Sequence, residues 1–560
     1  TIMTDQNITW MLDLGADHSL MLYGSWQMTS GNSQNQQFTT YGSPSESITD
    51  ATAGGNINNL NSELGQWRSM AVLGRLHYAY KGRYILDATI RWDGSTRFGP
   101  GNRWGSFPSV SGKWIVSDEK FMSSFQKWLS ELSLRAGWGI TGNMPDREYL
   151  YFARYNGSWS TGGNNYNGTP TIKPSSIELT NLKWERSTSV NLGLNLGLLD
   201  DRFDLNVYHR RTEDMLFKDQ RIPSSTGFGS LSYINAGTMD NDGWELNVNT
   251  NNLINIGKFT IDLNANLSNN KNTIRALDEN VLDSYNGEFD YNNGNYLTRV
   301  QTNNSFGSIY GLRSLGVYQY DKYSEKEVPG VSGPNAPVVR DKNGNVVFDS
   351  YGEPVPMYFA YGTTNSRRFR GGDAIYEDVN KDGTIDELDV VYLGNCNPKL
   401  NGGFGFTIRY NRRLSLTCFF NFRYGNKVIN YARMNAENMY TNDNQCVSVN
   451  WRWRKDGDIT NMPRALYQDG RNWMGSDRFV EDGSFLRWKQ LTLNYQFDPK
   501  TIKKIGLNTA SLYFTLNNIL TWTKYSGVDP EVGYDDKGIC ADWSKTPRSK
   551  YFTFGITIGL

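Results

Sequence analysis

No stretch of about 18 consecutive apolar residues occurs in the 560-residue sequence, so it predicts no membrane-spanning helix. Acidic and basic residues are equal in number, with 57 of each, and this lack of a basic excess argues against a nucleic-acid partner. The three histidines, His18, His77 and His209, lie far apart. Because no nucleophile-elbow, phosphate-loop or zinc-protease motif is present either, we expect no enzyme active site.

Cysteines and linkers are also scarce. Cys396, Cys418, Cys446 and Cys540 show no metal-binding spacing and no closely spaced pair. No proline-rich or serine-rich linker divides the 560 residues, although a soluble chain of this length usually has several domains. The sequence therefore favours a single large assembly.

Residues 187–211 have the two-residue period of a β-hairpin. Apolar and polar side chains alternate over 190–198, a tight turn follows at Asp200 and Asp201, and the alternation resumes over 203–210. Successive side chains of a strand point to opposite faces, so the hairpin has one apolar and one polar face. The apolar positions are Val190, Leu192, Leu194, Leu196, Leu198, Phe203, Leu205 and Val207.

The same alternation recurs at 259–267, 404–410, 414–422 and 552–560. Strands of roughly 10 residues are long for a soluble sandwich and suit a tilted membrane crossing. Short connections alternate with long ones at 270–303, 321–395, 426–482 and 523–547, as in outer-membrane barrels. We therefore predict an all-β, antiparallel transmembrane β-barrel whose polar face lines a water-filled or plugged lumen. An ordinary soluble two-sheet protein is the alternative.

Three other segments lack the strand pattern. Residues 30–61 are rich in Ser, Asn and Gly and are predicted to form a long loop. A short helical patch is predicted at 118–129, and residues 149–170 are predicted to form a loop rich in Tyr, Asn and Gly.

Seven blocks of the sequence resemble the SusC/RagA-type TonB-linked outer-membrane proteins. Each block is weak alone, but their order over nearly the whole chain matches the order in that family. The blocks are WDGSTRFG at 92–99 with RWGSFPSVS at 103–111, GITGN at 139–143, NLKWE at 181–185, NDGWE at 241–245, residues 373–394, SDRFVEDGSFLR at 476–487 and GVDPE at 527–531.

The resemblance implies the C-terminal part of a TonB-dependent receptor, with roughly 15 of about 22 barrel strands in residues 1–560. The family's plug domain and TonB box are not found in these residues, and Thr1 is not preceded by a signal peptide, so we expect further sequence upstream. The resemblance also implies an outer-membrane location, TonB as the energy-coupling partner and a SusD-like lipoprotein as a lid.

The function that the resemblance implies is TonB-dependent import of a nutrient. A glycan or oligosaccharide is the first expectation for the substrate, and a peptide is the second. A surface β protein that binds carbohydrate without transporting it is the alternative from another class, and a passive porin is the third.

Aromatic side chains in two predicted loops are candidates for stacking on sugar rings. They can equally pack the loops together or form the interfacial girdle. The candidates are Tyr155, Trp159 and Tyr166 in the first loop, and Tyr440, Trp451, Trp453, Tyr467 and Trp473 in the second.

Residues 378–389 follow the pattern of a calcium-binding loop, with Gly383 at its sixth position and Asp in place of the usual Glu at its twelfth. We predict one structural Ca²⁺ in an extracellular loop; an Asp-rich and Gly-rich turn without an ion is the alternative. The predicted ligands are Asp378, Asn380, Asp382, Thr384, Asp386 and Asp389.

Overall fold

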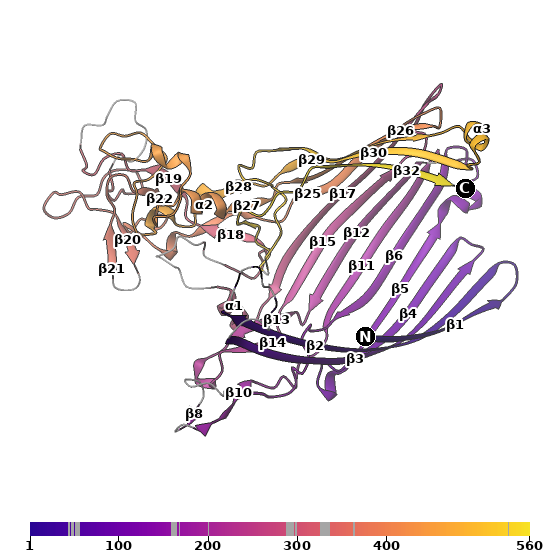
Figure 1. Cartoon of the computed structure of the whole chain (residues 1–560), viewed down its shortest axis with the longest axis horizontal. Coiled ribbons are helices and arrows are strands. Elements are labelled where there is room, and N and C mark those ends of the chain that lie inside the picture. The colour runs from indigo at the N-terminus through magenta and orange to yellow at the C-terminus, as the bar shows by residue number, and fades with distance from the viewer. Residues whose placement is uncertain are drawn as a thin grey trace. The chain divides into compact units, whose positions relative to one another are not determined.

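The computed structural model describes residues 1–42, 45, 47, 50, 56–157, 165–166, 169–199, 201–286, 296, 299–324, 336–361, 365–535 and 537–559. Strands make up most of its regular structure (Figure 1). Among the helices in these ranges, none is long and apolar enough to cross a membrane.

One sheet of sixteen strands dominates the fold, and its strands are hydrogen-bonded in the order in which they occur along the chain. This up-and-down order confirms the predicted antiparallel all-β fold. The short β16 (Ile254–Ile256) pairs only with β17. The other strands are β1 (Ile2–Asp13), β2 (His18–Tyr41), β3 (Asn56–Tyr80), β4 (Tyr84–Ser95), β5 (Trp104–Ile115), β6 (Leu129–Asn143), β11 (Glu185–Leu198), β12 (Asp201–Glu213), β15 (Thr238–Asn249), β17 (Phe259–Ala276), β25 (Leu400–Tyr410), β26 (Leu414–Tyr424), β29 (Phe485–Gln496), β30 (Thr509–Thr523) and β32 (Tyr551–Gly559).

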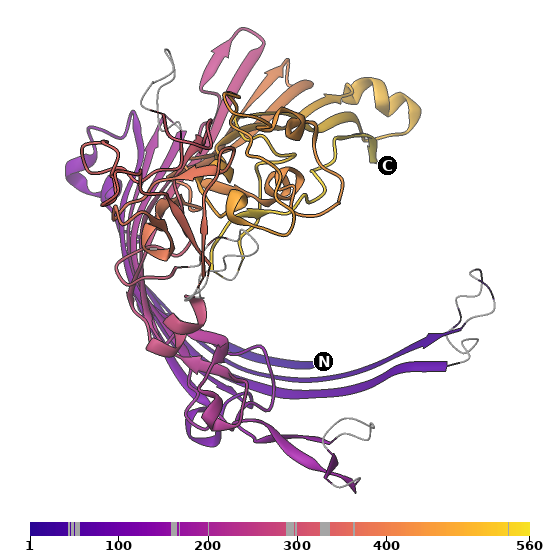
Figure 2. The same cartoon turned by 90° about the vertical axis from the view of Figure 1, so that its left-hand side faces the viewer.

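The chain divides into two compact units. Unit 1 contains residues 1–199, 205–242 and 275–281, and unit 2 contains residues 200–204, 243–274 and 282–560. Strands β1 to β6 and β11 belong to unit 1 (Figure 2), and strands β25, β26, β29, β30 and β32 belong to unit 2.

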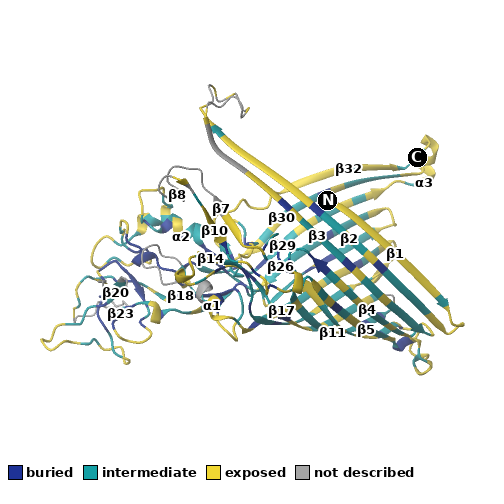
Figure 3. Cartoon of the chain, turned by 90° about the horizontal axis from the view of Figure 1, so that it is seen from below, coloured by how far each residue is buried: buried dark blue, intermediate teal, exposed yellow. Residues whose placement is uncertain are grey.

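The sheet exposes its apolar face. In unit 1, Val110 pairs with Trp138 and Trp138 pairs with Val190, so the three side chains share a face. Their exposed fractions are 43%, 40% and 44%, and Leu192 on the same face is 58% exposed. Figure 3 shows exposed residues recurring along the strands. The described residues leave this face uncovered, and hydrocarbon is a medium that stabilises such a face.

A row of aromatic rings lies on this apolar face at the short-turn ends of β2 to β5. Tyr80 and Tyr84 have ring centroids 6.2 Å apart, and Tyr84 and Trp114 have centroids 6.3 Å apart. The Tyr84 hydroxyl and the Trp114 Nε1 both donate to Glu119, at 2.5 and 3.2 Å. Rings with an apolar body and a hydrogen-bonded edge are typical of the boundary between membrane and water.

The connections fold into small sheets and packed cores of their own. In unit 1, Phe98, Leu150 and Tyr233 are buried in one such core. The described residues of unit 2 form three more, and the one with most members surrounds Phe359. The paired elements are β7 (Arg154–Gly157) with β10 (Ile172–Ser176), β8 (Asn165–Tyr166) with β9 (Thr169–Pro170), β13 (Leu216–Arg221) with β14 (Ser230–Asn235), β18 (Ser308–Gly311) with β24 (Val391–Asn395), β19 (Ser314–Val317) with β22 (Ala374–Tyr376), β20 (Tyr358–Tyr361) with β21 (Asn365–Arg368) and β23 (Thr384–Ile385), and β27 (Lys427–Asn430) with β28 (Val480–Asp482) and β31 (Ala541–Asp542). The helices are α1 (Glu279–Tyr285), α2 (Tyr431–Glu437) and α3 (Pro499–Ile502).

The prediction of a long loop over 30–61 is wrong for much of that segment. Strand β2 continues to Tyr41 and β3 begins at Asn56, with Asn32 paired to Gln66 and Gln36 to Ser62. Main-chain hydrogen bonds hold this ribbon together, so its polar side chains do not prevent strand formation.

Two further segments differ from the sequence prediction. The segment predicted to be helical, 118–129, follows a 3₁₀ turn at Val116–Asp118 and contains a second one at Lys120–Met122, after which come hydrogen-bonded turns rather than a helix. The sequence pattern does not predict strand β5. This strand contains Pro108 and several Ser and Gly residues, which hide its alternation.

Candidate functional site

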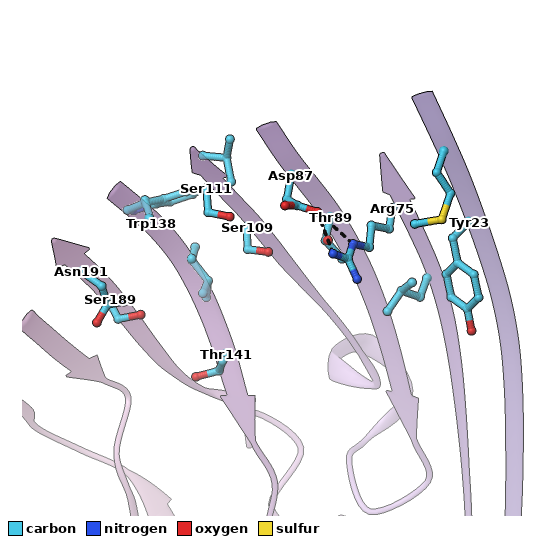
Figure 4. Close-up of a pocket in the computed structure, with 16 residues that line it drawn as sticks. Tyr23, Arg75, Asp87, Thr89, Ser109, Ser111, Trp138, Thr141, Ser189 and Asn191 are labelled. Carbon is cyan, nitrogen blue, oxygen red and sulfur yellow. Dashed lines mark hydrogen bonds and ion pairs between the residues drawn. The ribbon is translucent and has the colours of Figure 1, made fainter. Parts of the chain in front are cut away.

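A cleft of about 700 Å³ lies over β2 to β6 and β11 in unit 1 (Figure 4). We call it the polar cleft after its Arg, Asp, Ser, Thr and Asn side chains, although Met21, Leu73, Val110, Trp138 and Ile140 also line it. Its walls follow from the strand register. Asp87 pairs with Ser111, Ser111 with Gly137, and Gly137 with Asn191, so these positions form one row across four strands on one face. The next row is Arg75, Thr89, Ser109, Gly139 and Ser189.

The charged centre of the cleft is the Arg75–Asp87 pair. The Nε and Nη2 of Arg75 donate to Oδ1 of Asp87 at 3.1 and 2.7 Å. The Nδ1 of His77 lies 3.0 Å from the same oxygen. The ion pair and the histidine thus hold the carboxylate, and Figure 4 shows the Arg75–Asp87 contact beside Thr89.

A second cleft of about 540 Å³ shares Thr89, Ser109 and Thr141 with the first and continues along the same strands. Arg91 and Asp93 line it and pair at 2.8 Å. The polar face of unit 1 thus presents hydroxyl and amide groups among charges that are paired with each other. Such a surface offers hydrogen bonds to a neutral solute without a strong field of one sign.

The predicted calcium loop has its carboxylates bound to backbone N–H groups. Asp378 accepts from the amides of Lys381 and Gly383, at 2.7 and 2.9 Å. Asp389, which is fully buried, accepts from the amides of Val379 and Asp386, at 2.7 and 2.9 Å. The remaining contacts are Asp382 with the Thr384 amide at 2.8 Å, Asp382 with the Asn380 side chain at 2.9 Å, and Asp386 with the Leu388 amide at 2.7 Å.

Gly383 makes the turn of this loop, as the motif predicts. Its φ is +84°, and a β-carbon there would lie 2.6 Å from a methyl of Val339. In the described part of the chain, no group of three or more His, Cys, Asp or Glu side chains is arranged to hold a metal ion. Asx turns and a capping box at Asp386 therefore account for the fold of the loop without an ion, and the Ca²⁺ site stays a prediction.

The aromatic candidates do not form one group. Tyr155, Trp451 and Tyr467 are 61%, 76% and 64% exposed, and their rings are open to a ligand. Trp453 is half-buried and donates from Nε1 to the carbonyl of Gln319 at 3.0 Å; Tyr440 is also half-buried. Trp159 and the side chain of Tyr166 lie outside the described residues.

Trp473 is placed inside the loop core and not on a binding surface. Only 2% of the residue is exposed, and its ring centroid lies 6.0 Å from that of Phe479. The guanidinium of Arg478 lies 5.2 Å from the ring. With both neighbours in place, the Trp473 indole has no free face for a sugar.

Comparison with protein families identifies the sheet. The family model described as TonB dependent receptor-like, beta-barrel matches residues 2–351. The chain belongs to this TonB-dependent receptor β-barrel family. Members of the family are outer-membrane proteins, which fixes the location of the sheet and identifies its exposed apolar face as the lipid-facing one.

Individual relatives support the same family. TonB-dependent receptor P39 of Formosa agariphila is 30% identical over 90% of this chain and 47% of its own length. TonB-dependent receptor SusC of Bacteroides thetaiotaomicron is 28% identical over 87% of this chain and 43% of its own length. The chain thus spans about half the length of the curated relatives it matches. These matches confirm the resemblance read from the sequence blocks.

A solved structure shares the fold. The RagAB peptide transporter superimposes on 99% of this chain and 55% of its own chain with a TM-score of 0.74, at 23% sequence identity. At this identity the likeness concerns the fold of the TonB-dependent receptor barrel.

Sequence reasoning did not single out the residues of the polar cleft. Arg75, Asp87 and Ser111 lie on three different strands, β3, β4 and β5, and nothing in the local sequence distinguishes them from other polar residues of those strands. The register between strands supplies the missing information, because it brings residues of four strands into one row. Polar residues at alternating positions in neighbouring strands were the available signal.

Proposed function

We propose that this chain forms part of the barrel wall of a TonB-dependent importer that works with a SusD-like surface lipoprotein. Membership of the TonB-dependent receptor family and the lipid-facing row around Leu192 support this proposal. A surface protein that binds carbohydrate without crossing the membrane does not account for that exposed apolar row. TonB would act through sequence that the longer relatives carry and that residues 1–560 do not match.

For the substrate we infer a neutral oligosaccharide. The observation that carries this inference is the polar cleft of unit 1, where hydroxyl groups of Thr89, Ser109, Ser111 and Thr141 surround a neutralised ion pair. A sugar presents many hydroxyl groups and no net charge, so it matches these donors and acceptors. The exposed rings of Trp451 and Tyr467 in unit 2 would add stacking surfaces.

A peptide is the second candidate. The fold likeness to the RagAB peptide transporter is the observation that favours it. Backbone amides of a peptide would also find hydrogen-bond partners on a surface of hydroxyl and amide groups.

Uptake by cells that carry the protein, with and without TonB, tests the dependence on TonB and the choice of substrate. Labelled oligosaccharides of graded length and labelled peptides of equal mass are supplied separately, and transport is measured in each strain. Oligosaccharide uptake that is lost without TonB supports the proposal. Equal uptake in both strains would identify a passive porin, and uptake of peptides alone would replace the substrate. Recovery of the protein in a salt wash would reject the barrel.

A further inference from the structure

Two of the four cysteines meet in the loop region of unit 2, although they lie 144 residues apart. The backbone N–H of Cys540 donates to the Sγ of Cys396 at 3.0 Å. Both residues are buried, with exposed fractions of 1% and 0%, and both belong to one packed core. In the structure both are free thiols in hydrogen-bond contact.

The backbone around this pair is fixed on both sides. The N–H of Cys396 donates to the carbonyl of Gly307 at 2.8 Å, and the N–H of Ile429 donates to the carbonyl of Cys540 at 2.9 Å. The chain segments pass so closely that a β-carbon on Gly307 would lie 2.6 Å from the Gly538 carbonyl and 3.5 Å from the Cys396 β-carbon. The proximity of the two cysteines is therefore set by backbone contacts and not by the rotamer of either side chain.

The separation of the two chain segments that carry Cys396 and Cys540 is compatible with a covalent bond. An amide nitrogen is one bond from its own α-carbon, so its 3.0 Å contact with the partner's sulfur limits the separation of the two α-carbons to roughly 7 Å, and disulfides span up to about 6.8 Å. The other cysteines are placed differently: Cys418 lies on β26, and the Sγ of Cys446 contacts the Ser448 hydroxyl at 2.6 Å.

A metal site explains the pair less well. The hydrogen bond with Cys540 and the burial of the side chain raise the pKa of the Cys396 thiol, whereas the same hydrogen bond lowers the pKa of the Cys540 thiol, so Cys540 is the one that ionises more readily. A metal ion shared by the pair would require both sulfurs as thiolates, and the raised pKa of Cys396 opposes this. Within the residues that the structure describes, no further His, Cys, Asp or Glu group completes a metal-binding cluster at this pair.

We propose that Cys396 and Cys540 form a disulfide bond in the mature protein. An outer-membrane protein passes through the oxidising periplasm to the oxidising cell surface, so cysteines that the packing of the loops brings together meet conditions in which disulfides form and persist. The oxidant is the disulfide of a thiol–disulfide exchange protein: one thiolate attacks it, the second resolves the mixed disulfide, and the oxidant leaves as a dithiol. The two S–H bonds are replaced by one S–S bond, and the two electrons and two protons pass to the oxidant.

The bond would join two connections of the barrel. Cys396 lies between β24 and β25, and Cys540 lies immediately before β31. A covalent link there closes a loop of 144 positions, so it restricts the unfolded loops strongly. This inference does not depend on the identity of the substrate.

Thiol mapping of the protein from its own outer membrane decides the matter. Cells are denatured directly in an alkylating reagent so that air oxidation is prevented, and the purified protein is digested without reductant. We expect one cross-linked peptide pair containing Cys396 and Cys540, which separates on reduction, together with alkylated Cys418 and Cys446. Alkylation of all four cysteines without reductant would overturn the proposal.

Two variants sharpen the result. Cys396→Ser should leave Cys540 open to alkylation, whereas the matched control Cys418→Ser should leave the cross-linked pair intact. Reductant should lower the melting temperature of the wild type and of Cys418→Ser but not that of Cys396→Ser. A cross-link that persists in Cys396→Ser would refute the pairing. If Cys396→Ser does not assemble, the wild-type peptide map alone gives the answer.

Discussion

Asp373 and Arg464 form a two-point ion pair inside the loop region of unit 2. The Nε and Nη2 of Arg464 donate to the two carboxylate oxygens at 2.7 and 3.2 Å, and the Asp373 side chain is 0% exposed. The amide of Arg370 and the side chain of Asn472 also donate to this carboxylate, at 2.8 and 3.2 Å. One buried anion therefore holds together segments 91 residues apart.

Replacing Asp373 by Ala should destabilise the loop region by about 3–5 kcal/mol, because it leaves the donors of the partly buried Arg464 and the buried Asn472 without their acceptor. Limited proteolysis and urea unfolding of the purified protein measure the effect. The matched control is the more exposed Arg313–Glu377 pair, where Glu377→Ala should cost about 1 kcal/mol or less. Equal losses at both sites would show that Asp373 does not organise the loops.

The two faces of β11 should tolerate charge differently. Leu192→Arg places a cation on the lipid-facing row and should destabilise the membrane-inserted protein by about 2–4 kcal/mol. The neighbouring Asn191→Arg places the same side chain in the polar cleft and should be accepted. The folded fraction in outer membranes and urea unfolding in lipid vesicles provide the comparison. Equal tolerance would contradict the assignment of the faces.

Filling the polar cleft should block transport without affecting assembly. Ser111→Trp adds a large ring to the cleft, so we expect substrate uptake to fall at least tenfold with normal protein levels in the membrane. The control is Leu192→Trp, which places the same ring toward lipid at a position that does not line the cleft. Unchanged uptake in Ser111→Trp would remove the cleft from the substrate path.

Calcium binding should depend on the motif at 378–389. If the loop holds Ca²⁺, calorimetry on the purified protein should show binding that disappears in the double variant Asp378→Ala with Asp382→Ala. Chelation should then increase proteolysis near this loop in the wild type only. Binding that is unchanged in the double variant would mean that the carboxylates serve the backbone turns alone.

The strands were predictable because lipid and lumen impose alternation on each of them. Val190 and Leu192 carry that signal without any tertiary context, and the structure places both on the exposed apolar face. The ends of β2 and β3 were not predictable in this way, since the pairing of Gln36 with Ser62 is satisfied by main-chain hydrogen bonds alone.

The candidate site was less accessible to sequence reasoning. The Arg75–Asp87 pair comes from neighbouring strands, and the choice of partner depends on a register that no local pattern specifies. Trp473 shows the opposite error, because an aromatic residue in a loop looks like a ligand platform until the packing of Phe479 and Arg478 around it is known. The closeness of Cys396 and Cys540 likewise arises only from tertiary structure.

The packed core that contains Ile309, Cys396, Val428 and Val532 has a consequence for biogenesis. Its members come from three separate connections, between β17 and β25, between β26 and β29, and between β30 and β32. Contacts of such long sequence separation form slowly because the ends of large loops must first be brought together. This core should therefore pack last, once the connection between β30 and β32 is in place. A chain truncated before that connection would leave its earlier loops unpacked and open to quality-control proteases.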